Sequence, residues 1–149
     1  LTGLRNRNYL ESLGDDSVNK SLPVSVIMMD CNHLKRSNDL YGHEMGDELL
    51  RRTASVLRRV AGEKFVPMRV GGDEFLLICP YTDRESARQL VQDLRRGLAA
   101  ASDDALAVSA SFGIATVETP GCTLAEIYRV ADHNRYQEKR EVHAQDANR

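Results

Sequence analysis

The chain has 149 residues, of which 42% are hydrophobic and 28% charged, and its formal net charge is −2 at pH 7. These values predict one soluble globular domain with a sizeable core, and the charge gives no indication of a surface that binds nucleic acid or membrane. The longest apolar runs, such as residues 26–29, are far too short to span a bilayer.

The three cysteines, Cys31, Cys79 and Cys122, do not have the spacing of metal ligands. We expect them to be reduced thiols, which is typical of a cytoplasmic protein. From the length, we expect residues 1–149 to be a single domain. Because the chain begins at Leu1 without a methionine, we expect this domain to be a fragment of a longer protein. A membrane anchor elsewhere in that protein is compatible with this expectation.

The first half of the chain predicts helices around one strand. Residues 6–13 form a candidate first helix, and the apolar run 24–29 predicts a buried strand that ends at Asp30. Residues 34–40 are polar and predict a short helical turn. From Met45 to Val60 the apolar residues follow a helical period, which predicts a long amphipathic helix.

A glycine pair separates the next two apolar runs. Residues 65–70 and 75–79 predict two strands, and Gly71-Gly72 between them predicts a tight hairpin turn. Proline cannot donate a hydrogen bond to a sheet, so Pro67 indicates an edge strand.

The second half of the chain predicts two more helices and one more strand. Two capping boxes mark helix starts: Thr82 with Glu85, and Thr123 with Glu126. Residues 106–117 predict a strand in which Gly113 marks a bulge. Strands that include a hairpin, mixed with helices, indicate an α+β fold and not a doubly wound parallel sheet.

Three carboxylates stand out in this arrangement. Asp30 ends a buried strand, where a carboxylate is costly unless it is paired, hydrogen-bonded or bound to metal. If that strand neighbours the hairpin, Asp30 lies beside Asp73 and Glu74. Three carboxylates in one place repel each other unless a divalent cation is present. The alternatives are that Asp30 caps the following helical turn and that the hairpin has an ordinary solvated tip.

The segment from Arg69 to Phe75 resembles the signature of the GGDEF family, the bacterial diguanylate cyclases. Further segments resemble the family in the same order along the chain: residues 1–7, 30–39, 41–47, 109–115 and 131–139. A single five-residue match would be a weak signal, whereas this series covers nearly the whole chain.

The resemblance implies a palm-like nucleotidyl cyclase fold, with a central, mostly antiparallel sheet flanked by helices and a β-hairpin that carries the signature. The implied reaction condenses two GTP into cyclic di-GMP and two pyrophosphates, with Mg²⁺ or Mn²⁺ as cofactor and two ions per active site. It also implies a homodimer of domains with the active site between them, driven by a sensory or dimerising region that precedes Leu1.

The resemblance also implies roles for individual residues. The metal ligands would be Asp30, the Cys31 backbone carbonyl, Asp73 and Glu74. Asp73 would also help to deprotonate the 3′-hydroxyl, alongside Glu74 and Arg69 as catalytic residues. The implied substrate-binding residues are Leu34, Lys35, Asn38, Asp47, Gly71, Gly72 and Lys139.

The implied base readers, Asn38 and Asp47, suit guanine. A carboxylate can accept hydrogen bonds from both N1–H and the exocyclic amine of guanine, whereas adenine presents an acceptor at N1. Without the resemblance, Asn38 would be interpreted as a turn residue and Asp47 as a carboxylate in the first turn of a helix.

The chain departs from the family pattern at several positions. Asn32 replaces the second aspartate of the usual Asp-x-Asp, and Leu34 replaces a phenylalanine. Arg135 stands where the family has an apolar residue, and residues 140–143 replace the expected Gly-Arg-Asn run, so we expect a frayed C-terminal end. The product-inhibition motif would fall at residues 62–65 and is absent.

Two alternatives to an active cyclase remain, and Asn32 and the altered C-terminal helix favour the first of them. One is a catalytically weak or inactive domain that binds GTP as a regulatory module. The other is a related cyclase with altered base choice, against which Asp47 argues.

Overall fold

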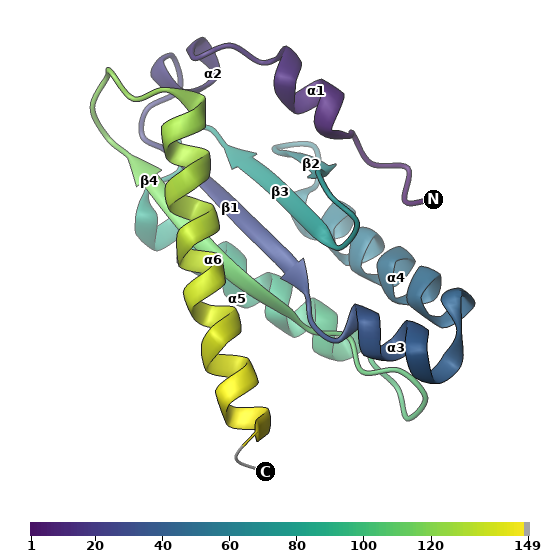
Figure 1. Ribbon diagram of the computed structural model, residues 1–149. Helices are drawn as coiled ribbons and strands as arrows, with labels where there is room; N and C mark the ends of the chain where they lie inside the picture. Colours follow the sequence, from purple (N-terminus) through teal and green to yellow (C-terminus); the bar gives the residue numbers. More distant parts are fainter. Residues whose placement is uncertain (148–149) are drawn as a thin grey trace.

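The computed structural model describes residues 1–147, and its centre is a four-stranded antiparallel sheet in the order β2-β3-β1-β4 (Figure 1). The strands are β1 (Val24–Cys31), β2 (Val66–Arg69), β3 (Glu74–Cys79) and β4 (Ala110–Val117). The helices are α1 (Arg7–Ser12), α2 (Asp16–Asn19), α3 (Leu34–Tyr41), α4 (His43–Ala61), α5 (Arg84–Ala101) and α6 (Leu124–Ala147). This is the α+β fold with a mostly antiparallel sheet that the sequence predicts.

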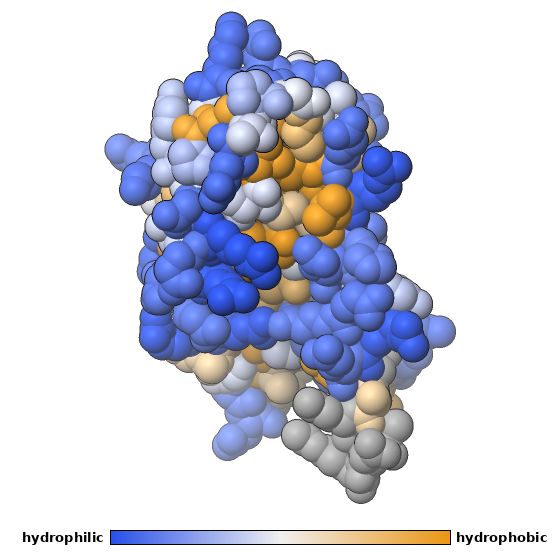
Figure 2. Space-filling view, turned by 90° about the vertical axis from the view of Figure 1, so that its left-hand side faces the viewer, coloured by the Kyte–Doolittle hydropathy of each residue, from blue (hydrophilic) through white to orange (hydrophobic). Residues whose placement is uncertain are grey.

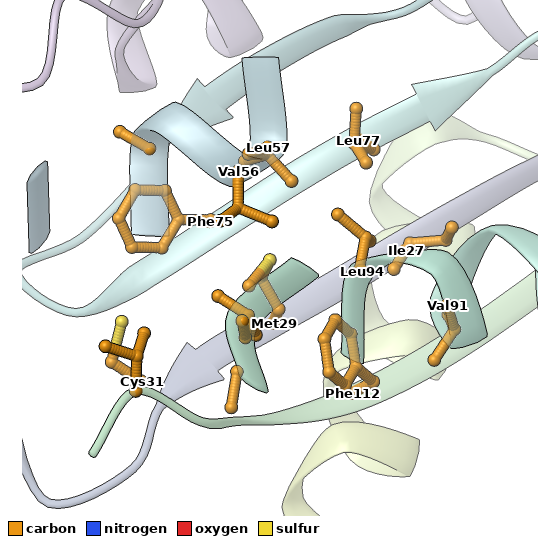
Figure 3. Packing of buried hydrophobic residues seen from close by; sticks show 14 of the residues in the cluster. Ile27, Met29, Cys31, Val56, Leu57, Phe75, Leu77, Val91, Leu94 and Phe112 are labelled. Carbon is orange, nitrogen blue, oxygen red and sulfur yellow. The ribbon is translucent and has the colours of Figure 1, made fainter. Parts of the chain in front are cut away.

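Helices cover both faces of the sheet. In Figure 1, α4 and α5 lie behind the sheet and α6 crosses its front face. Ile27 and Met29 of β1 point toward α4 and α5, where they pack among apolar side chains such as Leu94 (Figure 3). Val26 and Met28, which alternate with them, belong to a second cluster that contains residues of α1, α2 and α6. All eight residues of β1 are buried, because this strand is covered on both faces.

Several predicted elements are confirmed with small shifts in their bounds. Asn6 caps α1 by accepting a hydrogen bond from the Tyr9 N–H at 3.2 Å. Pro67 lies in β2, which is an edge strand as predicted. Thr123 accepts a hydrogen bond from the Glu126 N–H at 3.1 Å, which confirms its capping role at α6.

Four details differ from the prediction. The N-cap of α5 is Asp83 and not Thr82, because the helix begins one residue later and the Ser86 N–H donates to the Asp83 carboxylate. Gly113 makes no bulge, since β1 and β4 pair without interruption through Gly113 and Met28. The short helix α2 was not predicted. The C-terminal end does not fray within the described residues, because α6 continues to Ala147.

Gly113 allows a close contact between β4 and α6 and does not form the predicted bulge. A Cβ atom at this position would lie 2.1 Å from the Ala131 carbonyl oxygen and 2.2 Å from the Arg135 nitrogen. The absence of a side chain therefore lets the backbone of α6 lie directly against β4. This close approach fixes which residues of α6 face the C-terminal end of β1.

Among residues 1–147, no helix is both long enough and apolar enough to cross a membrane. Figure 2 shows one side of the molecule, where hydrophilic residues surround a limited hydrophobic area.

Candidate active site

The three predicted carboxylate residues meet at one end of the sheet. Asp30 pairs with Glu74 in the register of β1 and β3. The Cys31 N–H donates a hydrogen bond to the Asp73 carbonyl oxygen at 2.9 Å. The β1 strand therefore neighbours the hairpin, which is the arrangement that the prediction of a shared carboxylate site assumed.

Hydrogen bonds to two carbonyl groups close the hairpin that carries Asp73. The N–H groups of Val70 and Gly71 donate to the Glu74 carbonyl oxygen at 2.9 and 3.3 Å. The Arg69 guanidinium donates to the Gly72 carbonyl oxygen through Nε at 3.1 Å and Nη2 at 2.7 Å. Arg69 thus holds the glycine turn in this conformation.

Asp30 is 5% exposed, and its two carboxylate oxygens differ. Oδ2 accepts hydrogen bonds from Arg135 Nη1 and Lys139 Nζ, both at 2.7 Å. Oδ1 is buried and has no hydrogen-bond partner among the described residues. The alternative that Asp30 caps α3 is wrong, because the N-cap of that helix is His33.

The surroundings of Asp30 oppose its negative charge. Burial is the main effect that raises its pKa to about 6, and the nearby Asp73 adds to the increase, while the hydrogen bond from Lys139 works against it. A positive ion beside Asp30 and Asp73 would favour the ionised form of Asp30 and so oppose the effects of burial and of Asp73 on its pKa.

These residues fit a divalent cation. A buried carboxylate oxygen without a partner, next to a second carboxylate, is an arrangement that a hard cation stabilises. No group of three or more His, Cys, Asp or Glu side chains in the described part of the chain is arranged to hold a metal ion alone. Mg²⁺ usually has only one or two protein carboxylates and takes its other ligands from phosphates and water.

The Cys31 side chain is not available as a ligand. Its thiol is buried and donates to Thr53 Oγ1 at 3.5 Å, and burial raises its pKa to about 12. Only the backbone of Cys31 can therefore contribute to the site.

A cavity of about 600 Å³ has Asp73 in its lining, whereas Asp30 and Glu74 are not among the residues that line it. Five residues proposed from the sequence are among those that line it: Cys31, Leu34, Lys35, Asp73 and Lys139. The cavity is large enough for a small ligand such as a nucleotide.

The structure does not bring every predicted residue to this cavity. Arg69, Gly71 and Gly72 line a second cavity of about 590 Å³, whose other wall is the N-terminal segment 1–7. The glycine turn therefore separates two hollows, with Asp73 facing the first.

Asn38 and Asp47 lie on α3 and α4, the two helices that follow β1. A Cβ atom on Gly46 would lie 1.8 Å from Asn38 Oδ1. Any residue larger than glycine at position 46 would therefore collide with the Asn38 side chain. Oδ1 is buried without a hydrogen-bond partner among the described residues. Neither residue is among those that line the cavity of about 600 Å³.

The substitution at position 32 has a structural explanation. Asn32 donates to Ser109 Oγ at 3.0 Å and accepts from Ser111 Oγ at 2.9 Å. Its side chain thus ties the end of β1 to the start of β4. An uncharged amide suits this buried position between two hydroxyl groups.

The contact between Arg135 and Asp30 was missed by the sequence analysis. The only signal was an arginine at a position where an apolar residue was expected. Because 105 residues separate the two, the contact depends on how α6 is rotated against β4.

The residues 1–145 match the family described as "Diguanylate cyclase, GGDEF domain". The chain belongs to the GGDEF family. The response regulator PleD of Caulobacter vibrioides is 32% identical over 149 residues, with 93% of this chain and 33% of PleD covered. This GGDEF chain thus spans about a third of the length of that relative.

Two further comparisons bear on the GGDEF chain. The GGDEF domain of DgcB from Caulobacter crescentus, solved in complex with c-di-GMP, has a TM-score of 0.85 and 27% identity, with 94% of this chain and 88% of that chain covered. The cyclic di-GMP phosphodiesterase PdeR of Escherichia coli is 32% identical, with 93% of this chain and 22% of PdeR covered.

Proposed function

We propose that this GGDEF domain is a diguanylate cyclase, which condenses two GTP into cyclic di-GMP and two pyrophosphates. The observation that carries the proposal is the meeting of Asp30, Asp73 and Glu74 at one end of the sheet, where Asp73 lines a cavity of about 600 Å³. Relatives named as diguanylate cyclases support it. We also propose that the domain is part of a longer cytoplasmic signalling protein.

Asp30, Asp73, Glu74 and the Cys31 carbonyl would hold divalent cations in this reaction. Two bound Mg²⁺ or Mn²⁺ ions would make the 3′-hydroxyl more acidic and neutralise charge on the departing pyrophosphate. Asp73 would receive the proton from the 3′-hydroxyl. The oxygen then forms a bond to the α-phosphorus of the other GTP, and the bond from that phosphorus to pyrophosphate breaks.

The basic residues would hold the phosphates and stabilise developing charge. Lys35 and Lys139 line the cavity and carry the positive charge that a triphosphate needs. Leu34 would contact the nucleotide from the same wall. Arg69, with Gly71 and Gly72, lines the other side of the turn and would act on a nucleotide that reaches the hairpin from there.

Asn38 and Asp47 would bind guanine. The buried, unpaired Oδ1 of Asn38 supports this role, because an acceptor without a partner favours a donor such as an amine of the base. An adenine in the same place would leave polar groups unpaired and would be rejected.

The product has two equivalent phosphodiester bonds, and one domain would hold one GTP. Two copies related by a two-fold axis would therefore form the complete active site. The two hollows on either side of the glycine turn support this arrangement, since each copy would face its own GTP on one side and the partner's on the other.

The test is product formation from GTP and Mg²⁺, with the domain fused to a constitutive dimeriser. We expect cyclic di-GMP from the unmodified domain and a loss of about a hundredfold or more in Asp73→Ala. Asp104→Ala is the matched control, because Asp104 is an exposed carboxylate, and it should keep full activity. Equal product from both variants would contradict the role of Asp73.

The second candidate is a regulatory GTP-binding domain without turnover. It is favoured by the two cations of α6 that already occupy Asp30 and by the relative named as a phosphodiesterase. GTP binding without any product, in the dimerised domain, would select this function over the first.

A further inference from the structure

Arg135 makes an ion pair with the carboxylate at the centre of the candidate site. Its Nη1 lies 2.7 Å from Asp30 Oδ2, and its Nη2 lies 2.9 Å from Asp132 Oδ1. The Arg135 side chain is 11% exposed and that of Asp30 is 7% exposed. Such a shielded pair is screened much less by solvent than a surface ion pair.

The position of Arg135 is fixed by the packing of α6 on β4. The Cβ that Gly113 lacks would lie 2.8 Å from the Arg135 Cα, so the backbone at this residue rests on the strand. Asn134 donates to the Ile114 carbonyl oxygen at 2.8 Å. Glu138 accepts from the Phe112 N–H and pairs with Arg95. Arg135 thus projects from a helix that is held on both sides of it.

Two cations of one helix therefore share one carboxylate oxygen. Arg135 and Lys139 are four residues apart, one turn of α6, and both bind Asp30 Oδ2. Lys139 also lines the cavity of about 600 Å³, so its ammonium can turn toward a phosphate, whereas Arg135 is not among the residues that line it. A divalent ion bound at Oδ2 would have to displace the guanidinium, and one bound at the unpartnered Oδ1 would share the carboxylate with the guanidinium and be repelled by its positive charge.

Resting on the proposed metal role of Asp30, we propose that Arg135 is a tethered cation that competes with divalent metal ions for the Asp30 carboxylate. It raises the metal concentration at which the site becomes loaded. A guanidinium displaced from Asp30 remains bound to Asp132, which keeps its charge paired in both states. Arg135 is thus a positioning residue for metal loading and has no part in the attack of the 3′-hydroxyl on the α-phosphorus.

The experiment measures Mn²⁺ binding by the unmodified protein and by Arg135→Met, without nucleotide, from the decrease of the free Mn²⁺ signal in electron paramagnetic resonance. Methionine keeps much of the length and the apolar stem of arginine but removes its charge. We expect the half-saturating Mn²⁺ concentration to fall by about tenfold in Arg135→Met, because the guanidinium no longer pairs with this carboxylate or repels a cation beside it. Arg135→Lys should lie between the two.

The control variants separate this effect from a general change in charge and from failure of the metal site itself. Arg129→Met removes the same charge from an exposed position of α6 and should leave Mn²⁺ binding unchanged. When Asp30→Ala is added to both proteins, the difference in Mn²⁺ binding caused by Arg135→Met should disappear. Equal Mn²⁺ binding with and without Arg135, while Asp30→Ala still weakens it, would overturn the proposal alone. No effect of Asp30→Ala would overturn the metal role of Asp30 and the competition together.

Thermal unfolding gives a second measurement that does not depend on activity. In EDTA, Arg135→Met should unfold at a lower temperature than the unmodified protein, since Asp30 loses a buried partner. Mn²⁺ should raise the unfolding temperature of Arg135→Met more than that of the unmodified protein. An equal rise in both would contradict the competition.

Discussion

One polar side chain is buried near each end of β1, and the two side chains differ in how many of their polar atoms have hydrogen-bond partners. Ser25, at the start of the strand, has an Oγ that donates to the Thr82 carbonyl oxygen at 2.9 Å and shares a hydrogen bond with Thr116 Oγ1 at 2.8 Å. Asp30, near the other end, has one oxygen with two cations and one oxygen without a partner among the described residues.

This difference separates a structural polar group from a candidate functional one. A buried hydroxyl with all its partners stabilises the fold and leaves nothing for a ligand to bind. A buried carboxylate with an unpaired oxygen costs stability unless a ligand supplies what is missing. The Asp30 end of the strand therefore has a polar atom that a ligand could satisfy, and the Ser25 end has none.

The largest expected effect comes from removing the carboxylate at the binding end. Asp30→Ala should lower cyclic di-GMP formation by about a hundredfold or more, because the proposed cation site loses its buried ligand. The measurement is the rate of product formation from GTP and Mg²⁺ in the dimerised domain. Wild-type rates in this variant would show that the unpaired oxygen has no catalytic purpose.

The next effect concerns the second unpaired oxygen at this end, Asn38 Oδ1. Gly46→Ala should weaken GTP binding by about tenfold, since a methyl group would occupy the space of the Asn38 side chain and displace it. Calorimetric titration with a non-hydrolysable GTP analogue measures the change. Gly14→Ala is the matched control, because nothing lies within 4 Å of the position its Cβ would take. Equal affinities in the two variants would refute the role of Asn38.

At the structural end, a substitution should change stability and not activity. Ser25→Ala should reduce the free energy of unfolding by about 1–2 kcal/mol, because the Thr82 carbonyl and the Thr116 hydroxyl lose a buried partner. Urea denaturation measures the loss, and the rate per folded molecule should not change. A fall in that rate would show that the two ends of β1 are coupled.

The smallest effect is expected at Asp83, which lies beside Ser25 and caps α5. The hydrogen bond from the Ser86 N–H lowers the pKa of Asp83 below its usual value. A lowered pKa means that the ionised cap stabilises the fold fully above the unfolded-state pKa, and that this contribution disappears as the pH falls through the folded-state pKa. Asp83→Ala should therefore unfold at a lower temperature than wild type at pH 7, with a smaller difference at pH 3. Asp83→Asn keeps the cap without titrating and should show little pH dependence relative to Asp83→Ala.

Much of this architecture could be predicted from the sequence. The apolar run before Asp30 and the helical period of α4 depend on local patterns, and both were identified. The convergence of Asp30 with Asp73 and Glu74 followed from one further assumption, that β1 neighbours the hairpin, which the strand pairing confirms.

The remaining features depend on distances that no local pattern contains. The sequence offers two neighbouring N-cap residues for α5, Thr82 and Asp83, and only the position at which the helix begins shows that Asp83 is the cap. A glycine at position 113 is compatible with a bulge or with close packing of another element on β4, and the position of α6 shows that it is the second. The four residues of α2 are too few to show a helical period. The ion pair between Arg135 and Asp30 needs both the strand order and the rotation of α6.

At both margins of the sheet, some of the backbone groups that an additional strand would need are already engaged or absent. On the β4 side, Glu138 accepts from the Phe112 N–H and Asn134 donates to the Ile114 carbonyl oxygen. On the β2 side, Pro67 has no N–H, and the Arg69 N–H donates to the Arg5 carbonyl oxygen at 2.7 Å. Exposed strand edges are common starting points for aggregation and for the joining of sheets between molecules. An additional strand would therefore have to break these contacts before it could extend the sheet.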